Sequence, residues 1–275
     1  HWMVHSFPTR RSSDLPMSHN MQTFRITDIV AHHDGLKSFY VERPFTIKPG
    51  QFVTVWLPGI DEKPFSVSDM TADHLEITVK AVGPFTKELM NRRKGEYIGL
   101  RGPFGKGFAL KDNTLLVGGG IGMAPLRFLA RALGESGKRF RLIFGVRTAA
   151  DLPFQEYYRS LPGCTIVSED GSIGNKGLVT QFMDPIMEEA QIRHISAAGP
   201  ERMLMAVRDF SASRHIPYEL SFERYMKCGI GICGQCCMDG SGLRLCVDGP
   251  VLTAKKLAPI TEIGLPHRTA SGRRP

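Results

Sequence analysis

Long apolar runs are missing from this sequence of 275 residues. A helix that crosses a membrane needs about 20 consecutive apolar residues. The longest apolar runs here cover only a few positions, around 115–117 and 142–146. The sequence therefore predicts a chain that neither spans a membrane nor takes one as a partner.

Cysteine is scarce outside one short segment, because five of the six cysteines fall within residues 228–246. That spacing is too tight for the disulfide framework of a small secreted protein, and it is typical of a metal site in a reducing compartment. We therefore expect a cytoplasmic protein that binds metal through thiolates.

The sequence has no concentrated basic stripe, although its formal net charge is +8. Its 35 lysines and arginines are scattered, which argues against a nucleic-acid partner. Hydrophobic residues make up 42% and charged residues 23%, values that exclude a disordered or fibrous chain. Internal repeats are absent as well, so we expect ordinary folded domains.

The first residues do not look like part of a folded domain. Residues 5–15 read HSFPTRRSSDL, which resembles the in-frame translation of a sequencing adapter. Charged and hydroxyl side chains stand where a signal peptide would have its apolar region. We expect residues 1–20 to be a non-native or disordered leader, with the native start at Met17 or Met21.

The cysteine cluster carries the most specific motif in the chain. The expected ligands are Cys228, Cys233, Cys236 and Cys246. Their spacing is C-x4-C-x2-C-x9-C, whose first part matches the plant-type loop that binds a 2Fe-2S cluster. Gly229, Gly231 and Gly234 would let the backbone wrap a cluster and direct N–H groups at its sulfurs. The motif predicts single-electron transfer.

A zinc site with four thiolates is the alternative for these cysteines. Zinc ribbons usually pair two C-x2-C hooks, whereas here one loop is closed by a single distant cysteine. We interpret Cys237, beside a ligand, as a structural bystander, and Cys164, at the start of an expected strand, as a packing residue.

A glycine-rich turn follows an apolar strand in LLVGGGIGMAPL, residues 115–126. The turn contains Gly118, Gly119, Gly120 and Gly122, and a helix is expected to begin near Ala124. Backbone amides at such a turn suit a dinucleotide diphosphate. A second turn with Gly199 and Pro200 follows another expected strand, where parallel sheets bind ligands. Close packing without a ligand is the alternative for both turns.

The pattern of the chain changes twice. Short strands such as RITDIV, QFVTVWL and LEITVKAV alternate with turns over residues 21–111, which predicts an antiparallel β-barrel. Residues 112–216 alternate strands and helices, which predicts a Rossmann-like α/β domain with a parallel sheet. Residues 217–265 are expected to form a small cysteine module that is ordered by something other than an apolar core, followed by a tail, 266–275. The fold class is multidomain, β plus α/β.

This order of barrel, glycine-turn sheet and cysteine module resembles the ferredoxin-reductase superfamily. Within it, PGQFVTVWLPGIDEKPFSVS, LLVGGGIGMAPL and ERYMKCGIGICGQCCMDGSGLRLCVDGPVL are most similar to the electron-transfer subunits of the NAD-linked, two-subunit dihydroorotate dehydrogenase. The resemblance covers about residues 21–260.

The resemblance implies that the barrel binds FAD. The family's Arg-Pro-x-Ser type motif matches Lys63, Pro64, Phe65 and Ser66, with lysine where arginine is usual. A lysine supplies charge but lacks the planar fork of a guanidinium. The next contacts would come from Thr78, Val79 and Lys80, and a family Gly-Thr pair matches Phe85 and Thr86.

The resemblance also implies a relay. A catalytic partner subunit would oxidise dihydroorotate on FMN, and the electrons would pass through the 2Fe-2S cluster and FAD to NAD, in the synthesis of UMP. The partner would carry the acid–base chemistry, so no catalytic residue is expected in this chain. The family implies a heterotetramer with two copies of each subunit.

Two alternatives stay open. The FAD and 2Fe-2S subunit of a cytoplasmic sulfhydrogenase or an anaerobic sulfite reductase has a similar cysteine tail. A non-enzymatic regulatory module with zinc is a function of another class.

The sequence does not distinguish NAD from NADP as the electron acceptor. No acidic residue closes the second strand of the sheet, and Arg147 lies near it.

Overall fold

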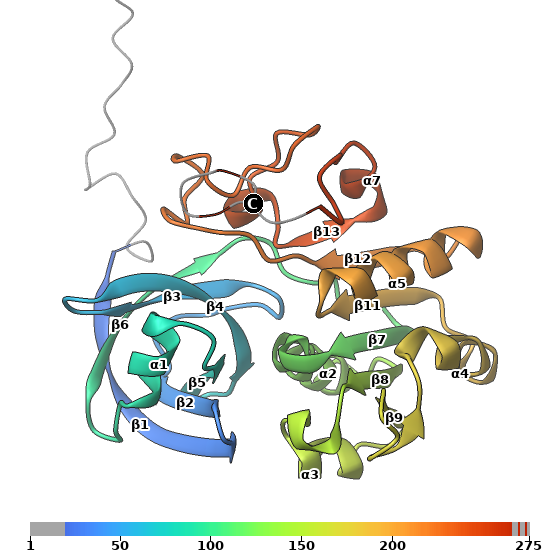
Figure 1. Cartoon of the computed structure of the whole chain (residues 1–275), viewed down its shortest axis with the longest axis horizontal. Coiled ribbons are helices and arrows are strands. Elements are labelled where there is room, and N and C mark those ends of the chain that lie inside the picture. Colours follow the sequence, from blue (N-terminus) through green and yellow to red (C-terminus); the bar gives the residue numbers. More distant parts are fainter. Residues whose placement is uncertain (1–19, 266–268, 270–272, 274–275) are drawn as a thin grey trace, which may run out of the picture.

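A computed structural model of the chain describes residues 20–265, 269 and 273. Most of the expected leader, 1–20, and most of the expected tail, 266–275, lie outside the described residues. The described part has two bodies side by side, a barrel and a layered sheet, with the cysteine-rich segment above them (Figure 1).

Six strands close the barrel in the order β1-β2-β5-β4-β3-β6, and all neighbouring strands are antiparallel. The strands are β1 (Gln22–His33), β2 (Leu36–Glu42), β3 (Phe52–Leu57), β4 (Asp61–Met70), β5 (His74–Lys80) and β6 (Tyr97–Phe104). Apolar side chains such as Phe39, Val55 and Ile77 fill the barrel, and helix α1 (Pro84–Met90) follows β5.

The predicted barrel is confirmed, but its sixth strand was not among the strand patterns that the sequence shows. In β6, Gly99 and Gly102 interrupt the alternation of apolar and polar residues on which strand prediction depends. Gly99 has a packing reason, because a Cβ there would lie 2.7 Å from a ring carbon of Trp56. The strand therefore follows from contacts across the barrel and not from local pattern.

Seven strands form the sheet, in the order β10-β9-β8-β7-β11-β12-β13, parallel except for β12 against β13. They are β7 (Thr114–Gly119), β8 (Phe140–Val146), β9 (Cys164–Ser168), β10 (Asn175–Lys176), β11 (His194–Ala198), β12 (Tyr218–Ser221) and β13 (Val251–Thr253). The chain adds strands on one side of β7 and then on the other. A crevice for ligands is expected where the strand order reverses in this way.

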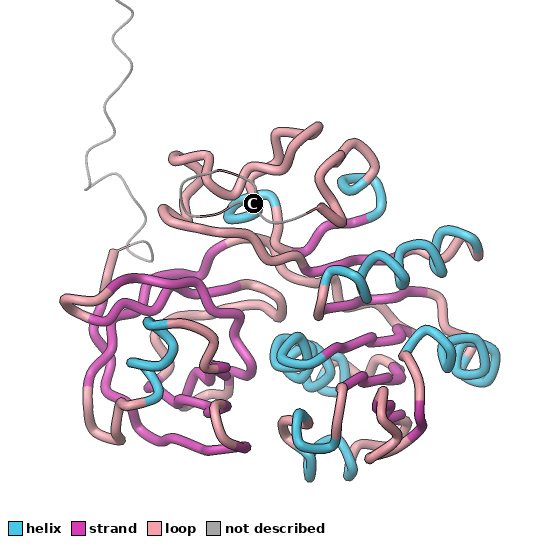
Figure 2. The backbone as a smooth tube through the Cα atoms, in the orientation of Figure 1, coloured by secondary structure: helices cyan, strands magenta, loops and turns pink. Residues whose placement is uncertain are grey.

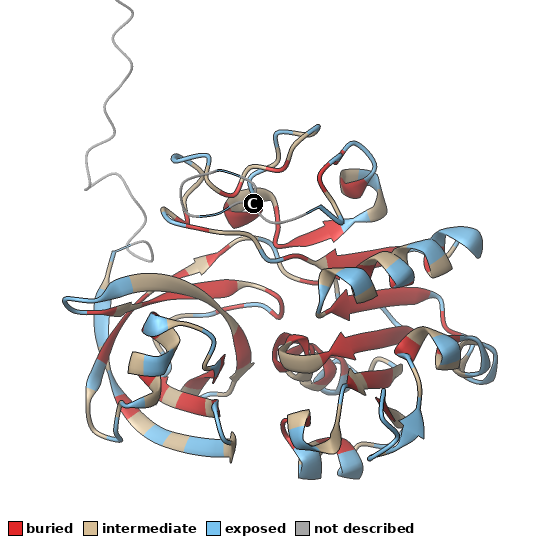
Figure 3. Ribbon diagram, in the orientation of Figure 1, coloured by how far each residue is buried: buried red, intermediate tan, exposed pale blue. Residues whose placement is uncertain are grey.

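Helices cover both faces of the sheet (Figure 2). Leu116 and Phe144 point toward α2 (Met123–Glu135) and α3 (Gln155–Ser160), whereas Leu115 and Ile143 point toward α4 (Met183–Ala190) and α5 (Glu201–Ser213). Both sides of each central strand are buried, which explains the apolar runs in the sequence (Figure 3). The predicted α/β fold is confirmed.

The cysteine-rich segment is an insertion between β12 and β13, which pair with each other at the edge of the sheet. It contains α6 (Leu245–Asp248), and α7 (Ala254–Leu257) follows β13. The expectation that something other than an apolar core orders this segment is wrong, because Met226, Met238 and Leu245 are buried in an apolar core together with residues of the sheet. The apolar residues of this segment are scattered among glycines and cysteines, so they show no periodic pattern that would have predicted their burial.

Within the described residues, we find no helix that is both long enough and apolar enough to cross a membrane.

Candidate functional site

The four predicted cysteine ligands lie in two pairs. The backbone N–H of Cys233 donates to Sγ of Cys228 at 3.5 Å, and that of Cys246 donates to Sγ of Cys236 at 3.4 Å. Ile232 N–H also donates to Sγ of Cys228, at 3.4 Å. The loop thus directs backbone donors at sulfur atoms, as clusters bound by thiolates require.

The surroundings of two thiols favour the thiolate form. The Cys246 thiol donates to Cys236 and lowers the pKa of Cys236 to about 6. Burial works against ionisation of Cys228, but backbone N–H groups, including that of Cys233, lower its pKa to about 7. Cys246, as the donor of its pair, has a raised pKa. Thiolates are the form in which cysteine binds iron or zinc.

Glycine is required where the loop turns around the sulfurs. Gly229 and Gly231 have φ values of +73° and +76°, a region that other residues rarely adopt. A Cβ on Gly231 would also lie 2.7 Å from a methyl carbon of Val247. The predicted role of these glycines in wrapping the backbone is consistent with this geometry.

The paired arrangement fits a two-iron cluster better than a single zinc ion. A structural zinc ion needs four ligands around one point, whereas each iron of a 2Fe-2S cluster takes two protein ligands. Cys237 faces elsewhere, since its Sγ donates to the carbonyl of Gly242 at 3.3 Å.

Arg101 of β6 ties the cysteine loop to the barrel. Its guanidinium donates to the carbonyl oxygens of Cys228 at 2.9 Å and Lys227 at 3.4 Å, and to Glu62 at 2.5 Å. No sequence pattern indicated this residue, because its two partners in the loop lie more than a hundred positions away along the chain.

A cavity of about 670 Å³ lies between the barrel, the sheet and the segment that leads to Cys228. Most residues predicted to bind FAD line it: Lys63, Pro64, Phe65, Ser66, Thr78, Lys80, Phe85 and Thr86. Val79 does not line it and packs in the barrel core instead, because successive side chains of a strand face opposite sides. Sequence reasoning missed Gly83, Ser221 and Arg224, which also line this cavity.

Lys63 brings a positive charge to this cavity. Partial burial works against its charge, but the paired Asp61 carboxylate outweighs it, and the pKa of Lys63 is raised. The Lys63 ammonium also lies 5.4 Å from the centre of the Tyr225 ring. A cation held in this way can bind a diphosphate, although it lacks the two-point geometry of arginine.

Phe85 and Thr86 form another part of the wall of this cavity. The Phe85 ring is buried with its centre 6.0 Å from that of Phe65. The Thr86 hydroxyl accepts hydrogen bonds from the backbone N–H groups of Val82, at 2.9 Å, and Gly83, at 3.0 Å. Thr86 therefore fixes the turn before α1, whose Gly83 and Pro84 face the cavity.

A second cavity, of about 750 Å³, lies at the carboxyl ends of the parallel strands. Of the residues predicted for the dinucleotide, Gly119, Gly120, Gly122, Gly199 and Pro200 line it. Gly118 does not line it and packs against α2 instead, where a Cβ would overlap the side chain of Met123. Arg147 lines the cavity too and pairs with Asp151 at 3.6 Å.

The two cavities share part of their walls. The shared residues are Lys80, Ile121, Gly122, Gly199, Phe222 and Glu223. The two glycine turns meet here, since a Cβ on Gly122 would lie 2.4 Å from the carbonyl oxygen of Ala198. Two ligands bound in these cavities would therefore meet at this wall.

Comparison with known proteins agrees with this arrangement. Residues 223–258 match the model of the iron-sulfur cluster binding domain of dihydroorotate dehydrogenase B, and residues 116–209 match the oxidoreductase NAD-binding domain. Among solved structures, one described as an NADH-dependent reduced ferredoxin-NADP oxidoreductase shares 30% identity and a TM-score of 0.77, over 85% of this chain and 88% of that chain.

Curated relatives cover nearly the whole chain. A protein of Methanocaldococcus jannaschii is 41% identical over 251 residues, which are 91% of this chain and 96% of the relative. One from Pyrococcus furiosus is 40% identical over 242 residues, 87% of this chain and 92% of the relative. Both are described as probable electron transfer subunits of dihydroorotate dehydrogenase B (NAD(+)). The paired thiols, the two adjoining cavities and this identity along the chain together place it in the family of dihydroorotate dehydrogenase B electron transfer subunits.

Proposed function

We propose that this chain passes electrons from a catalytic subunit of dihydroorotate dehydrogenase to NAD, through a 2Fe-2S cluster and FAD. The order of the sites carries this proposal. The cavity assigned to FAD borders the segment before Cys228 on one side and shares a wall with the nucleotide cavity on the other. When bound, FAD supplies the change between single electrons at the cluster and a hydride at nicotinamide.

The residues of the chain bind and orient the cofactors. Cys228, Cys233, Cys236 and Cys246 would hold the cluster, and the backbone donors around them would stabilise their thiolates. Lys63 would pair with the FAD diphosphate, while Gly122 and Gly199 would let the nicotinamide approach the flavin. No side chain of this chain needs to move a proton on dihydroorotate, so we assign none as catalytic.

The partner in this proposal is an FMN-bearing catalytic subunit, in a cytoplasmic heterotetramer with two copies of each chain. One feature supports a protein partner at the cysteine loop. Ile232, between two of the ligands, is 76% exposed, and Cys233 is exposed beside it. A partner protein could therefore approach the ligand Cys233 directly, and this exposure supports the proposed contact.

The descriptions of the curated relatives distinguish between the alternative functions that the sequence left open. The curated relatives are described as electron transfer subunits of dihydroorotate dehydrogenase B, which favours this function over that of a sulfhydrogenase or sulfite reductase subunit. The paired thiols favour iron-sulfur over a zinc-bearing regulatory module.

Two adjacent cysteines provide the test. The chain, produced with the catalytic subunit of a relative, should co-purify with flavin and iron-sulfur absorbance and form orotate with NAD. Cys236→Ser should lose the cluster absorbance and at least about 100-fold of the NAD-linked rate, because one ligand of four is gone. Cys237→Ser, one position away, should keep both. A colourless zinc protein, or equal loss in both variants, would overturn the proposal.

A further inference from the structure

Helix α2 lies between the two bodies of the molecule (Figure 1). It begins directly after the Gly120–Gly122 turn, which borders both cavities. Further along, its Phe128 is buried in the apolar core of the barrel. One helix thus carries the nucleotide turn at its start and the contact with the barrel on its side.

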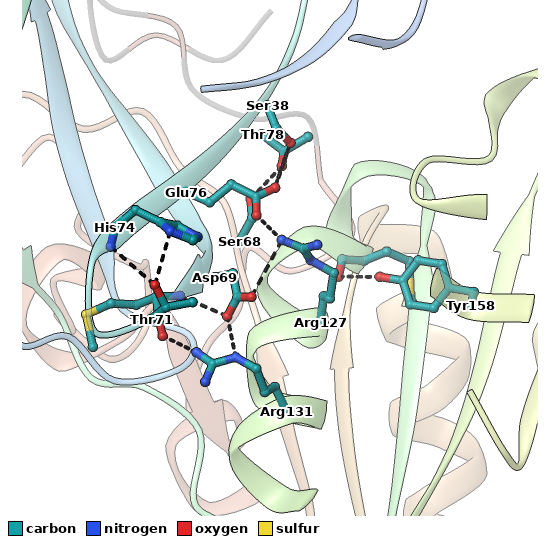
Figure 4. A network of polar contacts seen from close by, with 12 residues as sticks. Ser38, Ser68, Asp69, Thr71, His74, Glu76, Thr78, Arg127, Arg131 and Tyr158 are labelled. Atoms are coloured by element: carbon teal, nitrogen blue, oxygen red, sulfur yellow. Dashed lines mark hydrogen bonds and ion pairs between the residues drawn. The ribbon is translucent and has the colours of Figure 1, made fainter. Parts of the chain in front are cut away.

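Two arginines of α2, one turn apart, reach carboxylates of the barrel (Figure 4). Arg127 pairs with Glu76 of β5 and lies 3.8 Å from Asp69 of β4. Nε of Arg131 donates to the same Asp69 at 2.7 Å, and its guanidinium also bonds the carbonyl of Met70. These contacts cross from the sheet to the barrel.

The side chain of Arg127 is held from the sheet side as well. Its guanidinium carbon lies 4.4 Å from the centre of the Phe154 ring and 5.7 Å from that of Tyr157. Tyr158 donates to the carbonyl of Met123, the first residue of α2, at 3.2 Å. The Arg127 guanidinium is therefore held by aromatic rings of the sheet domain as well as by carboxylates of the barrel.

On the barrel side, contacts continue to the wall of the flavin cavity. Ser38 donates to Glu76 at 2.7 Å and lies 2.9 Å from the Thr78 hydroxyl, which also accepts from Ser68 at 2.7 Å. Thr78 lines the cavity assigned to FAD. A continuous chain of polar contacts therefore joins α2 to that wall.

The ion pair between Arg127 and Glu76 is largely buried. The side chains of Arg127 and Glu76 are 14% and 2% exposed. A buried ion pair adds little net stability over apolar residues of similar size, because desolvation offsets most of the attraction, but it accepts only a narrow range of geometries. Such a pair can therefore restrict how α2 is set against the barrel.

We propose that Arg127 is a positioning residue that holds the nucleotide turn in register with the flavin wall. The inference rests on the proposed function, since it assumes FAD in one cavity and nicotinamide in the other. Hydride transfer, which moves one proton with two electrons from NADH to the flavin, needs its two atoms about 3–3.5 Å apart, and a 1 Å misplacement can cost about 100-fold.

The test separates position from folding. Arg127→Met alone would leave Glu76 buried and unpaired, so the main variant is the double one, Arg127→Met with Glu76→Gln, which removes both charges. Arg139→Met, which breaks an exposed pair with Asp112 at 2.7 Å, is the matched control. Each full-length chain is loaded with FAD and cluster, and flavin reduction by NADH is followed without oxygen.

We expect the double variant to bind wild-type amounts of FAD and to lose about tenfold or more in the limiting rate of flavin reduction. The NADH concentration at half-saturation should change less than about threefold, since the nucleotide contacts remain. The long-wavelength absorbance of the nicotinamide–flavin complex should weaken. The control should match the wild type in all three.

Crystal structures of the wild type and the double variant give a readout that is independent of turnover. With the barrels superposed, the Gly120–Gly122 turn should move by about 1 Å. An unmoved turn, or a wild-type limiting rate in the double variant, would overturn the positioning role. A wild-type chain that binds FAD but is not reduced by NADH would overturn the proposed function, and the position of the turn alone would then decide the inference.

Discussion

His32 is a single side chain whose protonation depends on the buried polar contacts around Ser38 and Glu76. Its Nε2 lies 2.8 Å from the hydroxyl of Ser38, whose hydrogen points to Glu76, so the ring nitrogen acts as the donor. Its ring packs edge-on against Phe154, with centres 4.4 Å apart. Burial, together with the nearby charges of Arg127 and His33, lowers the pKa of His32 to about 4.

This lowered pKa predicts a loss of stability in mild acid. The unfolded chain binds the proton near pH 6.5 while the native chain resists it until about pH 4, so the contribution of His32 is complete above the first value and is lost between the two. Urea unfolding at about pH 7.5 and about pH 5 should show a smaller fall in midpoint for His32→Gln than for the wild type. Equal falls in both proteins would contradict the assignment, and His215→Asn, at an exposed position, is the control.

At the scale of elements, Arg101 connects β6 of the barrel with the loop that carries the first cluster ligand. Its guanidinium also lies 5.2 Å from the centre of the Phe104 ring, and Gly229 of the loop packs against that ring, where a Cβ would lie 3.2 Å from it. The loop therefore has two supports on one strand of the barrel, and the arginine is the polar one.

Removal of this support should loosen the cluster. Arg101→Met takes away the donors to two loop carbonyls, at a cost of about 2 kcal/mol. We expect faster release of iron to a ferrous chelator and a lower thermal midpoint. Arg92→Met, which also breaks arginine–glutamate pairs on the barrel but touches no loop residue, should release iron at the wild-type rate. Equal release from both variants would show that the loop holds the cluster unaided.

At the scale of the whole molecule, the cysteine segment and the sheet share one apolar core. Strands β12 and β13, which precede and follow the segment, are the last two strands on one side of the sheet. Met226 and Leu245 of the segment belong to the same apolar core as Ile195 and Leu204. The predicted boundary between residues 216 and 217 stays a prediction, but the sheet continues beyond it. A cut there would remove β12 and leave β11 as an unpaired edge of the sheet.

We therefore expect a chain that ends at residue 216 to aggregate, whereas one that ends at residue 265 should stay monodisperse. The shorter chain loses β12 and β13, together with the apolar side chains that these strands and the cysteine segment add to the core of the sheet. Size-exclusion chromatography and near-ultraviolet circular dichroism compare the two. A soluble shorter chain with cooperative unfolding would show instead that the cysteine segment is an independent module.

The sequence alone was sufficient for the features whose chemistry is local. The spacing of four cysteines in one short segment, with glycines between them, limits how the backbone can surround sulfur atoms, so the thiolate site could be predicted. The glycine turns after apolar strands likewise indicated a ligand crevice, because strand period and helix start depend on near neighbours. These patterns also carried the family resemblance.

Only the tertiary structure decided which distant residues meet. Arg127 lies 51 positions from Glu76, and Arg101 lies 127 positions from Cys228, so neither pair has a periodic signature in the sequence. The same holds for Val79, which turns into the barrel while its neighbours Thr78 and Lys80 line the cavity. Long-range ion pairs and side-chain directions depend on how folded elements pack, and packing is set by the whole chain and not by any one segment.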